Sequence, residues 1–267
     1  MNRIRPPAVA GVFYPGQAEV LRSMVLQLLS DNPGPDRAPG EVRALIVPHA
    51  GLIYSGPVAA RAFNLLKGTT AIGVHRRRRV LLLGPNHRVP LHGIAAPDVE
   101  MFATPVGSVS IDTQALAELE RRFDVQVRPD VHRNEHCLEV QLPFLHELLP
   151  GAKLVPLVVG QVSAEAVAEL VDWAWEQPDT LVVVSSDLSH YHSYADAQKI
   201  DGETDAELLR LRADIRPDQA CGAYALNGLM LAAKHQGLKI ERLDLRNSGD
   251  TAGGRDQVVG YGSYVLY

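Results

Sequence analysis

Arg79-Val-Leu-Leu-Leu-Gly-Pro-Asn-His87 is the stretch of sequence that decides the fold. Its apolar run has the length of a buried strand and ends abruptly at Gly84 and Pro85. His87 is therefore expected in the loop just past the strand, which is where open α/β sheets bind their ligands.

Two further apolar segments are followed by a histidine in the same way. Ala44 to Val47 leads into His49, and Leu181 to Val184 leads into His190. A single histidine of this kind is most often a capped or core imidazole. Three at equivalent positions indicate convergence on one site, because neutral imidazole is the commonest metal ligand and the usual acid/base group near neutral pH.

Strand and helix patterns alternate along the rest of the chain. This alternation predicts an α/β fold, layered α/β/α around a central mixed sheet. A single domain over residues 1–267 is expected, because no Pro/Gly/Ser-rich linker divides the chain. A helix is expected to begin after Pro57, another to open at Asn134, and a loop to cover 97–105. The main strands are expected over 42–47, 80–83, 153–159, 181–185, 240–245 and 258–266.

The composition narrows the class of protein. The 267 residues are 46% hydrophobic and 21% charged, which is ordinary for a globular protein. A net charge of −5 gives no support for a nucleic-acid or anionic-membrane partner, and the basic run Arg76 to Arg79 is typical of a solvated loop. Cys137 and Cys221 have no CxxC spacing, which suits a reducing cytoplasm. We see no signal-peptide pattern and no apolar run of roughly 18 or more residues that would cross a membrane.

The strand-end histidines fit a mononuclear metal site. Such a site typically takes two histidines and one carboxylate on one face and leaves positions open for substrate and oxygen. His49 and His87 would supply the imidazoles. Asp250, in the glycine-rich polar loop between the last two strands, is the first choice for the carboxylate, and Asp187 is the alternative.

His190 fits better as a general acid/base than as a metal ligand. Asp187 precedes it by three residues and can orient or tune an imidazole, although a turn or helix cap explains Asp187 equally well. A serine nucleophile is a weaker interpretation, because the serines near His190 lack a Gly-x-Ser-x-Gly elbow. Phosphate-cradling glycine motifs are missing too, which disfavours nucleotide chemistry.

Four other residues are candidate contacts of a substrate. Phe13 and Tyr14 are adjacent aromatics in a turn-rich segment and could line a pocket, although packing under the first helix explains them better. Glu135 and His136 lie at the start of a predicted helix. Ordinary capping and the orientation of metal ligands explain this polar pair equally well.

Six motifs follow one another from end to end of the chain: Pro6 to Pro15, Val47 to Gly51, Leu83 to His87, Glu135 to Phe144, Ser185 to His190 and Val259 to Tyr264. Together they resemble the Memo family, whose prokaryotic members are also called protein B of the AmmeMemoRadiSam system. That family is similar in fold to class III extradiol ring-cleaving dioxygenases, which use non-haem Fe(II) bound by two histidines and a carboxylate. The resemblance implies that His49 and His87 are metal-site histidines and that His190 and Asp187 line the same cleft.

The resemblance also bears on the metal. The animal Memo protein carries a cysteine as a further ligand, and Thr251 stands near its place here. A copper-type activity resting on that thiol is therefore not expected. A carboxylate from Asp250 would favour non-haem Fe(II), with another divalent metal as the alternative, and would leave Thr251 as a further candidate substrate contact.

Three functions are compatible with this sequence. The first is a metal-dependent oxidoreductase, dioxygenase-like, acting on an unknown small molecule. The second is a non-catalytic module that binds a peptide or protein through the same cleft. The third follows from the name of the family's system and places the protein beside an AMMECR-type protein and a radical-SAM enzyme.

Overall fold

The computed structural model describes residues 3–35, 40–67 and 79–267. Arg76, Arg77 and Arg78 of the basic run lie outside these ranges, so the predicted solvated loop stays a prediction. None of the helices within the described ranges combines the length and the apolar character that crossing a membrane requires.

A nine-stranded mixed sheet forms the centre of the molecule. Its strands follow the order β10-β12-β2-β9-β3-β8-β4-β7, and β11 pairs with β12. The four central strands β2, β9, β3 and β8 are parallel, which explains their continuous apolar sequences. The strands are β2 (Ala44–Val47), β3 (Arg79–Pro85), β4 (Ile94–Ala96), β7 (Val125–Val127), β8 (Lys153–Val159), β9 (Thr180–Ser185), β10 (His190–His192), β11 (Ile240–Asn247) and β12 (Val258–Leu266).

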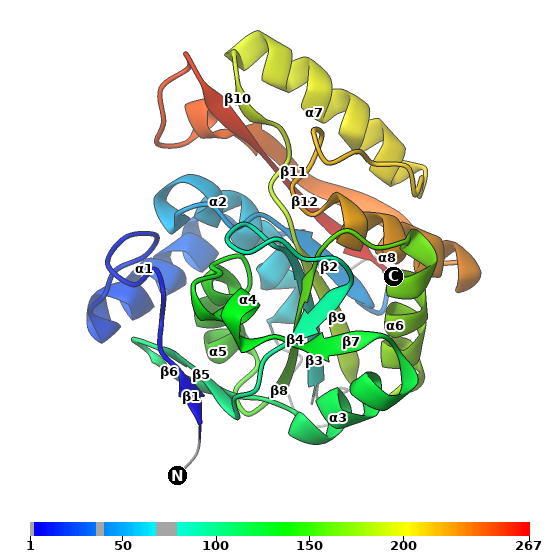
Figure 1. The fold of residues 1–267 in the computed structure, drawn as a ribbon. Helices are drawn as coiled ribbons and strands as arrows, with labels where there is room; N and C mark the ends of the chain where they lie inside the picture. Colours follow the sequence, from blue (N-terminus) through cyan, green and yellow to red (C-terminus); the bar gives the residue numbers. More distant parts are fainter. Residues whose placement is uncertain (1–2, 36–39, 68–78) are drawn as a thin grey trace.

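Helices cover both faces of this sheet. Figure 1 shows α1, α2 and α5 on one side and α6 and α8 on the other, while α7 packs against β11 and β12. The predicted α/β/α layering around a mixed sheet is confirmed. The helices are α1 (Ala18–Asp31), α2 (Leu52–Phe63), α3 (Thr113–Arg122), α4 (Pro129–Arg133), α5 (Leu142–Leu148), α6 (Ala164–Glu176), α7 (Tyr194–Leu209) and α8 (Ala223–His235), with short 3₁₀ turns η1 (Asn64–Leu66), η2 (Glu139–Gln141) and η3 (Ser248–Asp250).

Three elements differ from the sequence prediction. Helix α2 begins at Leu52 and contains Pro57, which was expected to precede the helix. The helix expected from Asn134 begins only at Leu142, because Pro143 is tolerated in a first turn and not in a helix interior. The expected loop over 97–105 contains β5 (Met101–Thr104), which pairs with β1 (Ile4–Arg5) and β6 (Gly107–Ser110) in a second, three-stranded sheet.

The register of the central strands brings the strand-end residues together. Val47 at the end of β2 lies opposite Ser185 at the end of β9, and Leu83 of β3 lies opposite Val184 of β9. Because carboxyl ends of neighbouring parallel strands meet at one edge of the sheet, His49, Asp187 and His87 leave the sheet side by side.

Candidate metal centre

A cleft of about 750 Å³ opens at this edge of the sheet. Imidazoles, aromatic rings and one guanidinium line it, together with glycines and Gln257 from the loop before β12. The lining side chains that matter for the chemistry are Phe13, His49, Tyr54, His87, Arg88, His136, Asp187, His190, Tyr191 and Tyr261.

Three of the imidazoles form a group within the cleft. His49, His87 and His136 each offer one ring nitrogen, and these nitrogens all lie within 4.8 Å of one another. The ring centroids are 5.2 Å apart for His49 and His87, 5.6 Å for His49 and His136, and 4.7 Å for His87 and His136. Nitrogens bound to one ion at roughly 2.0–2.1 Å in tetrahedral geometry lie roughly 3.4 Å apart, so binding would draw the three rings slightly closer together.

The hydrogen bonds around Ser185 fix the tautomer of His49. The Ser185 hydroxyl donates its one proton to the carbonyl oxygen of Cys137 at 2.7 Å and accepts from Gln141 Nε2 at 2.9 Å. Its remaining lone pair faces His49 Nδ1 at 2.9 Å, so Nδ1 carries the proton and donates. Nε2 of His49 is left without a proton, and its lone pair lies 3.4 Å from the sulfur of Cys221. Burial, followed by the neighbouring His87, lowers the pKa of His49 well below its ordinary value, so the ring stays neutral.

Glu135 orients His87 in the same way. Its Oε1 lies 2.8 Å from His87 Nδ1, and its Oε2 accepts the His87 backbone N–H at 2.6 Å. Burial alone would raise the pKa of Glu135, but the hydrogen bonds that it accepts from the ring and the backbone of His87 lower it to about 2. An ionised carboxylate holding Nδ1–H leaves Nε2 for a metal, which is the usual arrangement behind a metal-binding histidine.

His136 contributes the third imidazole. Burial, followed by His49, lowers its pKa to about 4, so it is neutral near pH 7 and available as a ligand. Its Nδ1 is buried and lies 3.3 Å from Glu135 Oε1, but makes no hydrogen bond within the described part of the chain. A buried ring nitrogen without a partner is costly, which fits a site completed by a bound ion.

A second set of ligand atoms, from His87, Glu135 and Cys137, lies behind this group. The Glu135 carboxylate is already used by His87 and by the backbone N–H groups of His136 and Cys137. The Cys137 thiol is fully buried and donates to the carbonyl oxygen of Pro85 at 3.0 Å. The three-histidine group is therefore the better candidate, because its outward ring nitrogens are not used in this way.

Asp187 and His190 both line the cleft. Asp187 Oδ1 accepts the backbone N–H of His49 at 2.7 Å, and its Oδ2 lies 4.0 Å from His49 Nε2. Burial raises the pKa of this carboxyl. The structure thus places the predicted acid/base pair beside the histidine group, and proton transfer by the pair stays a prediction.

The structure does not bring Asp250 to the histidines. Its Oδ1 accepts from the Tyr194 hydroxyl at 2.5 Å, and its Oδ2 accepts the Asn247 backbone N–H at 3.1 Å, which closes a capping box around η3. The carboxylate lines a separate cavity of about 150 Å³. Among the described residues, Asp250 belongs to no group of three ligand atoms within 4.8 Å, and His136 stands where Asp250 was expected.

The predicted substrate contacts are divided by the structure. Phe13 lines the cleft, and its ring centroid lies 4.7 Å from that of His136. Tyr14 is buried and is not among the residues that line the cleft; its hydroxyl donates to Glu139 Oε1 at 2.5 Å. Thr251 is not among the lining residues; its hydroxyl donates to the carbonyl oxygen of Ser248 at 3.2 Å. Glu135 acts behind His87 and is likewise not among the residues that line the cleft.

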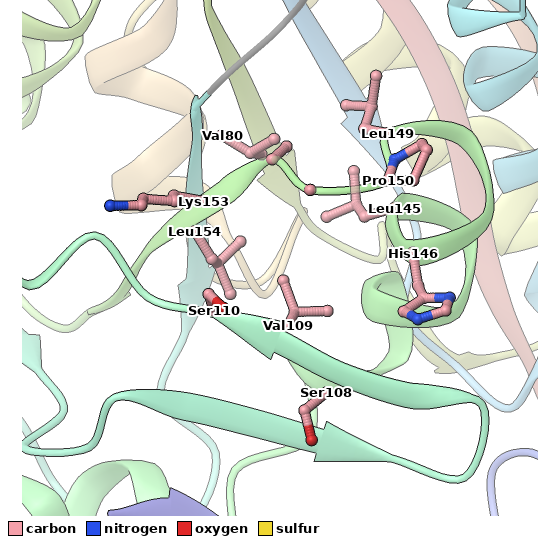
Figure 2. A pocket seen from close by; sticks show the side chains of 12 residues that line it. Val80, Ser108, Val109, Ser110, Leu145, His146, Leu149, Pro150, Lys153 and Leu154 are labelled. Atoms are coloured by element: carbon pink, nitrogen blue, oxygen red, sulfur yellow. The ribbon is translucent and has the colours of Figure 1, made fainter. Parts of the chain in front are cut away.

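A second cavity lies at the opposite end of β3 and β8. It has a volume of about 140 Å³, and its lining combines apolar Val80, Leu145 and Leu149 with polar Ser108, His146 and Lys153 (Figure 2). Figure 2 shows Lys153 pointing away from His146. Since its ionisable side chains do not converge, this cavity offers no comparable binding site.

The buried histidines predict an acid-sensitive stability for the metal-free protein. Burial lowers the pKa of His132, whose Nε2 lies 2.9 Å from the Ala95 carbonyl oxygen, to about 4, as it does for His136. The unfolded chain takes up protons below about pH 6.5, where the folded imidazoles do not. We therefore expect the free energy of unfolding to be unaffected by these groups above that pH and to fall by up to about 3 kcal/mol per histidine towards pH 4.

Urea unfolding at a series of pH values measures this effect. A His132→Gln variant should show a flatter dependence than the wild type, while replacement of the exposed His235 by alanine should leave the slope unchanged. Equal unfolding free energies at about pH 7 and about pH 5 would contradict the expectation.

The comparison with known proteins decides the family. A family model described as Memo-like protein matches residues 5–265. The chain belongs to the Memo family. A MEMO1 family protein of Methanocaldococcus jannaschii is 33% identical over 290 residues, covering 100% of both chains. One from Caldivirga maquilingensis is 30% identical over 290 residues, covering 98% of this chain and 99% of the other. The predicted Memo membership is confirmed.

A solved structure supports the fold of this Memo-family chain. The crystal structure of an uncharacterized protein from Escherichia coli K12 aligns with a TM-score of 0.52 at 14% sequence identity. The match covers 83% of this chain and 99% of the other. At this identity the likeness concerns the fold alone.

Proposed function

We propose that this member of the Memo family is a mononuclear metal-dependent enzyme in which His49, His87 and His136 bind the ion. The observation that carries the proposal is a pair of hydrogen bonds: Ser185 holds Nδ1 of His49, and Glu135 holds Nδ1 of His87. Each bond leaves the Nε2 atom of its histidine as an acceptor in the same cleft. Protein sites use such hydrogen bonds to fix the orientation of metal-binding imidazoles. Imidazole ligands suit iron, zinc and copper, and we expect Fe(II), with another divalent metal as the alternative.

The reaction class we propose is that of an oxidoreductase, dioxygenase-like, on a small molecule. A bound Fe(II) would supply open coordination positions for a substrate and oxygen. His190 and Asp187 would hold and transfer the proton of a substrate hydroxyl, because they line the same cleft as the histidine group. Phe13, Tyr54 and Tyr261 give the cleft aromatic side chains against which a planar substrate can stack.

Metal analysis of the anaerobically reconstituted protein tests the site. We expect about one Fe(II) per chain in the wild type, and at least about tenfold weaker binding in His49→Ala and His87→Ala, since even loss of a supporting group typically costs 10–100-fold. His235→Ala, in an exposed pair with Asp172, is the matched control and should bind as the wild type does. A wild type without stoichiometric metal, or variants that bind equally well, would refute the proposal.

The other functions expected from the sequence stay predictions. Recognition of a peptide or protein would use the same cleft. A joint function with an AMMECR-type protein and a radical-SAM enzyme would need a protein-binding surface, and the contacts within the cleft do not define one.

A further inference from the structure

Cys221 lies next to His49 of the proposed metal centre, although the two residues are far apart in the sequence. It lies directly before α8, whose N-cap is Gly222. The Gly222 N–H donates to the Ser186 hydroxyl at 2.9 Å, and a Cβ at Gly222 would come within 2.7 Å of that oxygen. Because residue 222 is a glycine, the start of α8 can pack closely against Ser186, which follows β9. This close packing places Cys221 next to His49.

The sulfur atom of Cys221 sits between two groups of the site. Its Sγ lies 3.4 Å from His49 Nε2 and accepts the Asp187 backbone N–H at 3.3 Å. Ser185 has already assigned the proton of His49 to Nδ1. The Nε2 lone pair therefore faces the thiol, whose S–H can donate to it or to the Asp187 carbonyl oxygen at 3.6 Å in the metal-free protein.

The same distance suits two ligands of one ion. An ion with metal–nitrogen bonds of roughly 2.0–2.1 Å and metal–sulfur bonds of roughly 2.3 Å in tetrahedral geometry separates the two ligand atoms by about 3.5 Å. The Asp187 backbone N–H donates to the same sulfur atom, and helix α8 begins two residues after Cys221.

We propose that Cys221 is a further, thiolate ligand of the ion bound by His49. On binding, the thiol proton is released to solvent and a sulfur–metal bond forms, with no change in oxidation state. Cys221 stands outside the group of three nitrogens that lie within 4.8 Å of one another, so binding has to draw Sγ towards the ion. This inference rests on the metal centre proposed above and adds a soft ligand to it, which disfavours magnesium, calcium and manganese.

Cys137 provides a natural control. Its thiol is fully buried and donates to the Pro85 carbonyl oxygen. Its backbone N–H donates to Glu135 Oε1. The chain has two cysteines in total. A sulfur–metal signal in a Cys137→Ser variant can therefore come only from Cys221.

Substitution with Co(II) gives a readout that does not depend on activity. We expect the wild type and Cys137→Ser to show visible d–d bands together with a near-ultraviolet sulfur-to-cobalt charge-transfer band. Cys221→Ser should keep the d–d bands, lose the charge-transfer band and bind Co(II) about tenfold more weakly. Cys221→Ala serves as a second variant, and circular dichroism confirms that each variant is folded.

The outcomes separate this inference from the proposed function. Visible d–d bands without charge transfer in Cys137→Ser would overturn the role of Cys221 and leave the histidine site standing. Persistence of the charge-transfer band in folded Cys221→Ser would overturn it as well. A wild type that shows no cobalt bands at all would refute the metal centre itself and this inference with it.

Discussion

Replacing Glu139 by alanine is expected to lower the free energy of unfolding by about 3–5 kcal/mol. Its fully buried carboxylate accepts from Arg5 Nη1 at 2.7 Å, from the backbone N–H of Ala8 at 2.7 Å and of Val9 at 3.0 Å, and from the Tyr14 hydroxyl. The alanine variant would leave the guanidinium of Arg5, itself buried, without its counter-charge. Urea unfolding of the purified variant measures the loss.

An exposed ion pair serves as the control for this prediction. Arg128 and Asp130 are joined at 2.7 Å on the surface, where water screens the charges and a lost pair contributes little. Asp130→Ala should therefore leave the unfolding midpoint almost unchanged, and Glu139→Gln, which keeps one acceptor oxygen, should fall between the two. If Glu139→Ala unfolds no more readily than Asp130→Ala, the buried pair does not have the role assigned to it.

Replacing Glu135 by glutamine is expected to weaken metal binding by about 10–100-fold without removing a ligand. One carboxylate oxygen faces His87 Nδ1 and the backbone N–H of His136, while the other accepts the backbone N–H of His87. An amide has one acceptor oxygen and would turn an NH₂ group towards a donor. The ring of His87 would then lose the charge-assisted hydrogen bond that fixes its tautomer.

Chelator competition with Fe(II) or Zn(II) measures the change in affinity. Glu147→Gln is a matched substitution, because this residue pairs with Arg22 on the exposed side of α5 and should leave the affinity unchanged. Equal affinities for Glu135→Gln and the wild type would show that the carboxylate does not support His87.

Much of the fold could be predicted because each central strand is recognisable from its own short stretch of apolar residues. Strands β2, β3 and β9 are buried on both faces, so each reads as a continuous apolar run, and parallel pairing places their carboxyl ends together. His49 and His87 follow directly from that geometry. The start of α5 shows the opposite case: the sequence predicts a helix from Asn134, whereas α5 begins at Leu142 with Pro143 in its first turn.

The rest of the site depends on contacts between distant segments. The Asp250 carboxylate does not face the histidines, because it accepts a hydrogen bond from the hydroxyl of Tyr194, 56 residues earlier in the chain. The tautomer of His49 depends on Ser185, 136 residues later, and the position of Cys221 is 172 residues from His49. No periodicity or spacing in one sequence encodes such pairings, so the sequence favours the carboxylate of Asp250, whereas the structure groups His136 with His49 and His87.

His136 shows the same limit at shorter range. The sequence leaves two roles open for its neighbour Glu135, which are helix capping and the orientation of a metal ligand. In the structure Glu135 orients the ring of His87. His136 is brought beside His49 and His87 by the fold of the segment between α4 and η2, where its ring also contacts that of Phe13.

The place of β12 in the sheet has a consequence for how the centre is made. This strand lies between β10 and β2 and also pairs with β11 (Figure 1). It carries Val259 and Tyr261, which line the cleft. During synthesis the ribosome releases the three histidines well before β12, since chains emerge from the N-terminus onwards. Until β12 has paired, the histidines lack part of the wall around them, so loading of the ion is expected to follow the pairing of β12 with β2.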